Sequence, residues 1–194
     1  YTYIVITENM LPNILTISRI CFIPMIMTCF YLQMSLSMYF AFALFVLACI
    51  TDFLDGYIAR QYKSTSNFGK CFDPVADKLL VGTVIIMICG FGYVSGLNMI
   101  AATIILFREI FVSGMREYLI EIKVPLPVTR LAKIKTTTQM ASLSVIIFGI
   151  AEANKTTLKI GIVLLWIAAV LTIITGYQYF KKGISKILDN ESIS

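Results

Sequence analysis

Histidine is absent from this sequence of 194 residues, and charged residues make up only 14% of it. The first absence excludes histidine zinc sites, Ser-His-Asp triads and histidine proton shuttles. The second excludes an ordinary soluble domain, in which about a quarter of the residues are charged. The five cysteines form no CxxC pair, and we interpret them as small buried hydrophobic residues. Any chemistry must therefore use carboxylates, lysine, arginine, hydroxyl groups or metal ions.

Long uncharged segments dominate the sequence, in which 58% of the residues are hydrophobic. They cover residues 20–51, 79–107, 136–151 and 160–180. A helix of about 20 apolar residues crosses the roughly 30 Å hydrocarbon core of a bilayer and satisfies its own backbone hydrogen bonds there. The sequence therefore predicts an all-α integral membrane protein. No soluble segment is long enough for a second domain, so we expect residues 1–194 to form a single transmembrane domain.

The lengths of these segments predict a six-helix transmembrane bundle. The first segment is too long for one helix, and the turn signals Gly90, Gly92 and Gly96 divide the second. Each half of the second segment reaches full length only by including charged flanking residues. We expect no signal peptide before Leu11, because that segment lacks a basic region and a cleavage site. The predicted spans cover about 13–32, about 38–59, a third that includes 73–78, a fourth that continues to about 119, a fifth from 133–135 to 151, and about 158–180.

Positive charge alternates between the connections of the predicted bundle. The 2–3 and 4–5 connections and the C-terminal tail carry most of the lysines and arginines, which predicts cytoplasmic termini. The net charge of +5 indicates anionic lipid headgroups rather than nucleic acid, because no soluble basic surface is visible. Tyr177, Tyr179 and Lys181 resemble an interfacial anchor. This orientation predicts a cytoplasm-facing polar cavity that gathers Arg19, Asp52, Asp55, Asp73, Asp77, Arg108, Glu109, Arg116 and Lys135.

Four aspartates fall within 26 residues, at spacings that suit helices. Asp55 follows Asp52 by three positions and Asp77 follows Asp73 by four, so each pair shares a helix face. The short connection between the two helices makes them antiparallel neighbours, which lets these faces meet. Intramembrane carboxylates cost on the order of 2.5 to 3.5 kcal/mol each, or roughly 10 to 14 kcal/mol for four. Such clustering indicates a function rather than a structural need.

Simpler roles are available to individual aspartates. Asp73 precedes a proline and could act only as a helix N-cap. Asp55 precedes a glycine and could belong to a turn. Asp52 could pair with Arg60 or Lys63. None of these roles explains why four acids gather in one short stretch, whereas one or two hard divalent cations do.

The chemistry of this acidic group points to phosphate transfer. A cation held only by oxygen atoms is Mg²⁺, Mn²⁺ or Ca²⁺ rather than zinc or copper. Gly56 and Ala59 share the helix face of Asp52 and would let a phosphate-bearing substrate approach the backbone, although they also suit close helix packing. Two metal ions could bridge a pyrophosphate and activate an attacking hydroxyl group. The residues therefore favour phosphoryl-type transfer.

The complete pattern D-x2-D-G-x2-A-R-x8-G-x3-D-x3-D resembles the signature of the CDP-alcohol phosphotransferase family, and every fixed position is matched. The resemblance implies six transmembrane helices, a homodimer, a dinuclear Mg²⁺ or Mn²⁺ site, and displacement of CMP from a CDP-linked donor by an alcohol. It implies that Asp52, Asp55 and Asp73 are metal ligands. Asp77 would be the general base and would also contact metal. The residues implied for the CDP-diacylglycerol pocket are Gly56, Ala59, Arg60 and Gly69.

Further segments extend the resemblance, to bacterial phosphatidylglycerophosphate synthases, over nearly the whole chain. They cover residues 12–19, 72–80, 108–117 and 133–140. This branch implies CDP-diacylglycerol as donor, glycerol 3-phosphate as acceptor, and phosphatidylglycerol phosphate and CMP as products. It also implies a multi-pass protein of the bacterial cytoplasmic membrane with its active site facing the cytoplasm. The alternatives are a cardiolipin, phosphatidylserine or inositol-phosphate type of CDP-diacylglycerol-dependent transferase and, in a different class, a cation transporter.

Basic residues after the aspartates suit an anionic acceptor. Arg108 and Arg116 are eight positions apart, close to one helix face, and Lys135 begins the next predicted helix. We expect these three cations to bind the phosphate of glycerol 3-phosphate, although they could merely snorkel to the membrane interface. For Lys123 and Lys133 we prefer the snorkelling interpretation.

Two residues near the start of the first predicted span are candidates for nucleotide contact. Thr16 and Asn13 lie within the segment that resembles the synthases, and we expect them to touch the CDP group of the donor. Asn13 could equally cap the first helix.

Overall fold

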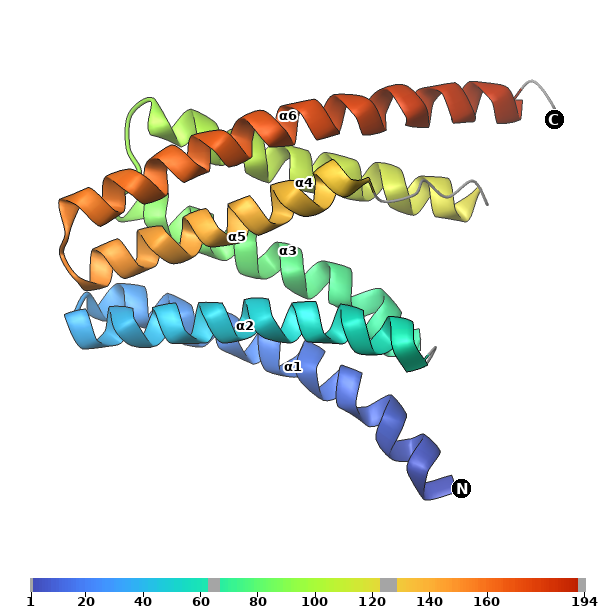
Figure 1. Cartoon of the computed structure of the whole chain (residues 1–194), viewed down its shortest axis with the longest axis horizontal. Helices are drawn as coiled ribbons and strands as arrows, with labels where there is room; N and C mark the ends of the chain where they lie inside the picture. The colour runs from blue at the N-terminus through green and yellow to red at the C-terminus, as the bar shows by residue number, and fades with distance from the viewer. Residues whose placement is uncertain (1, 63–66, 123–128, 192–194) are drawn as a thin grey trace.

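The computed structural model is all-helical, and the part of the chain that it describes forms six α-helices (Figure 1). It describes the backbone of residues 2–62, 67–122 and 129–191, and the side chains of residues 17–53, 72, 75–122 and 129–185. The helices are α1 (Thr2–Leu32), α2 (Ser35–Tyr62), α3 (Asn67–Gly90), α4 (Asn98–Glu121), α5 (Arg130–Ala151) and α6 (Lys155–Glu191).

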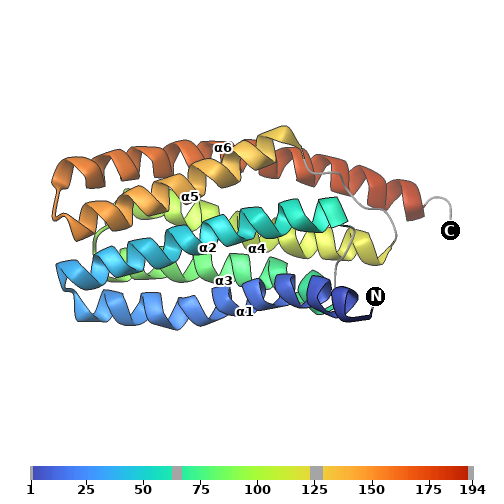
Figure 2. The ribbon, with the colours of Figure 1, turned by 60° about the horizontal axis from the view of Figure 1, so that its bottom comes forward.

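The helices run side by side, with successive helices pointing in opposite directions (Figures 1 and 2). The α1–α2, α3–α4 and α5–α6 connections lie at one end of the bundle, and both chain termini lie at the other. α6 packs against both α4 and α5, while α1 packs against α2 and α3. Six antiparallel helices thus return the chain to the end of the bundle at which it starts.

Local signals in the sequence explain where the helices end. The α3–α4 turn contains Gly92 and Gly96 at φ values of 77° and 59°, a left-handed conformation that glycine adopts without steric cost. Thr129 caps α5, because its side-chain oxygen accepts a hydrogen bond from the backbone N–H of Ala132. The side-chain oxygen of Asn154 accepts hydrogen bonds from the backbone N–H groups of Thr156 and Thr157, in the first turn of α6.

The predicted spans match the observed helices in order and approximate position, with differences at the outer ends. α3 includes residues 73–78 and α4 continues past residue 119, as predicted. α1 begins earlier than the predicted residue 13, and α6 continues to Glu191, beyond the predicted end at residue 180. The prediction counted only apolar residues, whereas a helix can continue into water when its polar side chains remain good helix formers.

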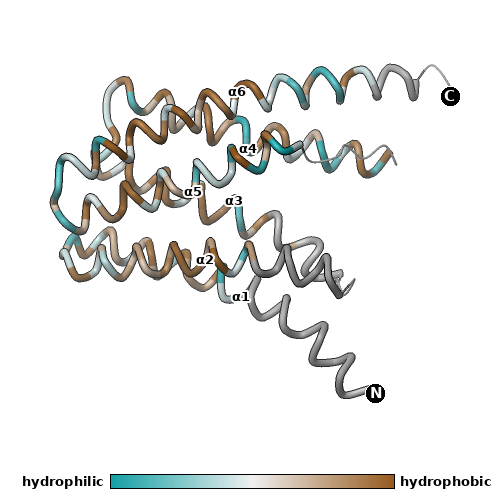
Figure 3. The backbone as a smooth tube through the Cα atoms, in the orientation of Figure 1, coloured by the Kyte–Doolittle hydropathy of each residue, from teal (hydrophilic) through white to brown (hydrophobic). Residues whose placement is uncertain are grey.

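Apolar side chains form both a packed interior and an exposed exterior. The main core contains Phe30, Phe45, Ile88, Leu143 and Leu165, contributed by five different helices. Many other large apolar side chains point outward, as expected for a protein whose surroundings are lipid rather than water. Hydrophilic residues gather at the α5–α6 turn and along the C-terminal part of α6 (Figure 3).

Four helices in the described residues are long and apolar enough to cross a membrane, judged by length and composition. These segments are Ser35–Phe53, Asn98–Glu121, Arg130–Ala151 and Lys155–Ser185. A shorter apolar stretch, Ile17–Leu32, belongs to α1. The structure therefore supports a membrane protein with several spans.

The α5–α6 pair is packed especially closely because glycines remove side chains from the contact. A Cβ atom added at Gly149 would lie 2.7 Å from the backbone nitrogen of Leu158. One added at Gly161 would lie 2.6 Å from Cγ1 and 2.9 Å from the backbone nitrogen of Ile146. The hydroxyl of Ser142 donates a 3.0 Å hydrogen bond to the carbonyl oxygen of Gly161. Small residues and a hydrogen bond are typical of helix contacts inside membranes.

We expect Gly161→Ala to destabilise the protein by about 1 to 3 kcal/mol, because the new methyl group meets backbone that cannot move away. The change should lower the thermal unfolding midpoint in detergent. Gly114→Ala in α4 is the matched control, since no described atom lies within 4 Å of the added Cβ. That control should leave the midpoint unchanged or raise it. Equal midpoints for both variants would contradict the close α5–α6 contact.

Candidate active site

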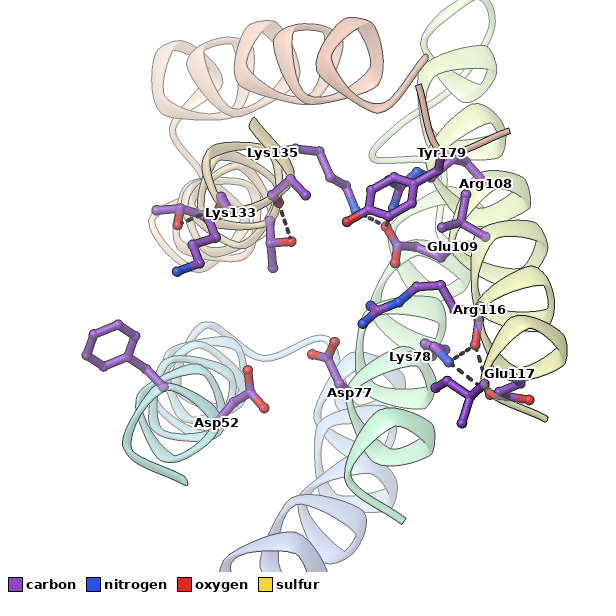
Figure 4. Close-up of a pocket in the computed structure, with 17 residues that line it drawn as sticks. Asp52, Asp77, Lys78, Arg108, Glu109, Arg116, Glu117, Lys133, Lys135 and Tyr179 are labelled. Carbon is purple, nitrogen blue, oxygen red and sulfur yellow. Dashed lines mark hydrogen bonds and ion pairs between the residues drawn. The ribbon is translucent and has the colours of Figure 1, made fainter. Parts of the chain in front are cut away.

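A cavity of about 580 Å³ opens among α2, α3, α4, α5 and α6. Its volume falls in the range of about 300 to 1,000 Å³ that is usual for small-molecule sites. Asp52, Asp77, Arg108, Arg116 and Lys135, all of which the sequence analysis selects, line it together (Figure 4). The cavity therefore brings together these five residues from four different helices.

The acidic side of the cavity is formed by α2 and α3. Asp52 and Asp77 direct their carboxylates into the space between these helices (Figure 4). Asp52 Oδ1 lies 2.6 Å from an Nη atom of Arg19, whose side chain is buried in α1. The simpler expectation that Asp52 pairs with Arg60 or Lys63 lies outside the described side chains. One partner of Asp52 is therefore Arg19 of α1, 33 residues earlier in the chain.

Several predicted site residues lie where the structure describes only the backbone. Asp55 and Gly56 continue α2 after Asp52, and Asp73 precedes Asp77 by one turn of α3. The other predicted residues whose side chains lie outside the described set are Asn13, Thr16, Ala59, Arg60 and Gly69. The proposed roles of these side chains stay predictions.

The described acidic residues suit a hard divalent cation. Asp52 and Asp77 offer carboxylate oxygens from two helices to one cavity, and Mg²⁺ and Mn²⁺ prefer oxygen ligands. Among the described side chains, no group of three or more histidine, cysteine, aspartate or glutamate residues gathers. The remaining predicted ligands, Asp55 and Asp73, lie outside that set. The metal site therefore stays a prediction.

The basic side of the cavity is formed by α4 and α5. Lys135 is only 2% exposed, and its ammonium group contacts Oε1 of Glu109. Arg108 Nη1 lies 3.6 Å from the same Glu109 oxygen. One carboxylate thus compensates two largely buried cations, which would be very unfavourable without a partner.

A second polar cluster connects α3 with α4 at the edge of the cavity. The ammonium group of Lys78 contacts Oγ of Ser113, and Ser113 donates a 3.1 Å hydrogen bond to Oε1 of Glu117. Lys78 Nζ also lies 3.8 Å from that oxygen. Arg116 projects into the cavity between Asp77 and Glu109 (Figure 4). Lys133, which we expect to snorkel, is exposed and lines the cavity.

Tyr179 contradicts one expectation from the sequence. It is not an exposed interfacial anchor: the residue is only 4% exposed, lines the cavity and packs with Val112 and Leu119. Tyr177, two positions earlier, is 66% exposed, as an anchor should be. Two helical positions differ by about 200°, so the two tyrosines face opposite sides of α6.

The sequence contains a weak signal for the inward face of this helix. Thr172, Thr175 and Tyr179 are all buried. Their positions i, i+3 and i+7 place them on one face of α6. Arg19 and Glu109 have no individual role that spacing predicts, although both fall within the predicted cavity. Their importance depends on partners from other helices, which spacing along one helix does not reveal.

Comparisons with known proteins agree with the motif. The sequence profile described as CDP-alcohol phosphatidyltransferase matches residues 9–174. The chain is 54% identical over 175 residues to a Rickettsia felis protein named CDP-diacylglycerol–glycerol-3-phosphate 3-phosphatidyltransferase, covering 90% of this chain and 95% of the relative. A Rickettsia prowazekii protein of the same name shows the same identity and coverage. A Cereibacter sphaeroides protein, also of that name, is 36% identical over 217 residues, covering 93% of this chain and 98% of the relative. The chain belongs to the CDP-alcohol phosphatidyltransferase family.

Proposed function

We propose that this protein transfers the phosphatidyl group of CDP-diacylglycerol to glycerol 3-phosphate, giving phosphatidylglycerol phosphate and CMP. The observation that carries the proposal is the cavity in which carboxylates from α2 and α3 lie opposite cations from α4 and α5. Such a cavity has one side suited to metal ions on a pyrophosphate and another suited to a phosphate monoester. The names of the relatives at 54% identity support the same reaction.

In this proposal, Arg108, Arg116 and Lys135 bind the phosphate of glycerol 3-phosphate. Guanidinium groups form paired hydrogen bonds with phosphate oxygens, and a buried ammonium group adds a compact charge. This binding holds the acceptor with its terminal hydroxyl group directed toward the acidic side of the cavity. Holding both reactants in place lowers the entropic part of the barrier.

Asp77 accepts the proton of that hydroxyl group as the general base. The hydroxyl oxygen forms a bond to the phosphatidyl phosphorus, and the bond from phosphorus to the CMP oxygen breaks. CMP leaves with the electron pair of that bond. Asp77 reaches the cavity from α3, on the side opposite the cations of α5, which suits a base acting on an acceptor held between the two sides.

The four aspartates Asp52, Asp55, Asp73 and Asp77 would hold two Mg²⁺ or Mn²⁺ ions. When bound, such ions neutralise charge on the pyrophosphate of the donor. Asp52 is 41% exposed at its side chain and therefore accessible from the cavity. Its Arg19 partner orients the carboxylate from the buried side.

The donor pocket that we propose continues from this acidic side. Gly56, Ala59, Arg60 and Gly69 would contact CDP-diacylglycerol, with Asn13 and Thr16 beside the nucleotide. Gly56 follows Asp52 by four positions on α2, so the helix itself directs both toward the same face.

We further propose that all six helices cross the bacterial cytoplasmic membrane, as a single domain that forms a homodimer. The antiparallel arrangement and the placement of both termini at one end support an even number of passes. The basic residues near that end support a cytoplasm-facing cavity in contact with anionic lipid.

The reaction itself is the first test. Purified protein supplied with CDP-diacylglycerol, Mg²⁺ and several alcohol acceptors should release CMP and form phosphatidylglycerol phosphate, identified by mass. Chelation should abolish turnover, and added Mg²⁺ or Mn²⁺ should restore it. A product from another acceptor would reassign the substrate, and full turnover in chelator would disprove the metal requirement.

Asp77→Asn should reduce the rate of transfer by about a hundredfold to ten thousandfold, the usual contribution of a general base. Donor binding should persist, because the other predicted metal ligands remain. Single-turnover kinetics and donor titration measure the two effects separately. Glu152→Gln is the matched control, since this exposed carboxylate lies at the α5–α6 turn. Unchanged transfer by Asp77→Asn would assign the base role to another residue.

Arg108→Ala and Lys135→Ala should each raise the KM for glycerol 3-phosphate by about tenfold to a hundredfold, as expected for a lost charge-assisted hydrogen bond. The KM for CDP-diacylglycerol should change much less. Lys159→Ala provides the control, because this exposed lysine lies in the first turns of α6, away from the cavity. An effect confined to the donor would assign the two cations to nucleotide binding instead.

A further inference from the structure

Arg108 is held from the side of α6, although the arginine itself belongs to α4. Its guanidinium Nη2 donates a 3.2 Å hydrogen bond to Oγ1 of Thr175. Its Cζ atom lies over the ring of Tyr179, 5.7 Å from the ring centroid. These two contacts fix the plane of the guanidinium group, because one acts at its edge and the other at its face.

The backbone of α6 also fits the stem of this arginine. A Cβ atom added at Gly176 would lie 3.2 Å from Cγ of Arg108, which is tighter than an ordinary contact. Thr175 can accept the hydrogen bond from Arg108 because its own hydroxyl group donates to the carbonyl oxygen of Leu171, at 2.8 Å. We call Thr175, Gly176 and Tyr179 the α6 seat of Arg108.

Tyr179 connects this seat with the helix that carries Lys135. Its hydroxyl oxygen accepts a 3.4 Å hydrogen bond from the backbone N–H of Thr129, the residue that caps α5. Lys135 follows Thr129 by less than two turns of α5. One tyrosine therefore contacts the arginine of α4 through its ring and the start of α5 through its hydroxyl group.

Glu109 contacts both Arg108 and Lys135. Its Oε1 atom contacts Lys135 and lies 3.6 Å from Arg108. An arginine or lysine side chain that is already ordered loses little further entropy when it binds a ligand, so its affinity is higher. The contacts of α6 and Glu109 therefore preorganise Arg108, and Glu109 also orders Lys135.

We propose that Tyr179 and Thr175 are positioning residues that hold the Arg108 guanidinium in the orientation that binds the phosphate of the acceptor. This inference rests on the proposed function, in which Arg108 binds glycerol 3-phosphate. Tyr179 and Thr175 act through Arg108 rather than on the reacting atoms. They determine acceptor affinity while leaving the donor site and the chemical step to α2 and α3.

The test compares steady-state kinetics of Tyr179→Leu, Tyr179→Phe and Thr175→Val in purified full-length protein. Tyr179→Leu should raise the KM for glycerol 3-phosphate about fivefold to thirtyfold, as expected when a desolvated cation–π contact is lost. Thr175→Val should raise it about threefold to tenfold. In both, kcat and the donor KM should stay within about twofold. Tyr179→Phe retains the ring and should recover most of the acceptor affinity.

Two substitutions on the same helix serve as matched controls. Tyr177→Leu makes the same change at an exposed position. Thr172→Val makes the same change at a buried threonine whose Oγ1 has no hydrogen-bond partner among the described residues. Both should leave the acceptor KM unchanged. Two results would overturn the proposal. One is that the KM values for acceptor and donor rise together, and the other is that the variants of the α6 seat have the same acceptor KM as these controls. Because Thr175→Val keeps the side-chain shape, it tests the proposal even where Tyr179→Leu fails to fold.

A wrong assignment of the acceptor would give a result that differs from a failure of the α6 seat. The unmodified protein would then turn over no glycerol 3-phosphate, and calorimetric titration with inorganic phosphate would test the seat directly. The phosphate dissociation constant should rise about fivefold to thirtyfold in Tyr179→Leu and stay constant in Tyr177→Leu. Equal constants in the two variants, or no phosphate binding by the unmodified protein, would overturn the proposal.

Discussion

The contact between Lys135 and Glu109 is the interaction on which the basic side of the cavity depends. A buried ammonium group without a partner costs several kcal/mol, and Lys135 is almost completely buried. Glu109 supplies its partner from α4 and also approaches Arg108. α4 and α5 both pack against α6, and the ion pair joins α4 to α5. The three helices thus form a positively charged surface on which Glu109 compensates part of the charge. Positive charge can therefore be kept inside an otherwise apolar bundle.

The two sides of the cavity differ in charge. The carboxylates of Asp52 and Asp77 come from α2 and α3, whereas Arg108, Arg116 and Lys135 come from α4 and α5. The oppositely charged residues that adjoin them contact partners on neighbouring helices: Lys78 of α3 contacts Ser113, and Glu109 of α4 contacts Lys135. The distance of the two aspartates from the cations of α4 and α5 leaves room for a ligand that carries negative charge at one position and binds cations at another.

Much of this arrangement is predictable from the sequence, because glycine turns and apolar length determine the ends of most helices. The alternation of helix direction then brings Asp52, Asp77, Arg108 and Lys135 to one cavity. Hydropathy does not reveal which way a polar side chain faces in a helix that is apolar on all sides. It therefore misplaced Tyr179, and spacing along single helices could not identify the Arg19–Asp52 pair, which joins two helices.

That pair has a consequence for how the protein is made. Arg19 belongs to α1 and Asp52 to α2, so both helices are synthesised before the rest of the cavity exists. Once these two helices are made, the arginine and the aspartate can pair with each other rather than remain two isolated charges. The first two helices can therefore compensate this buried arginine before α3 to α6 are synthesised.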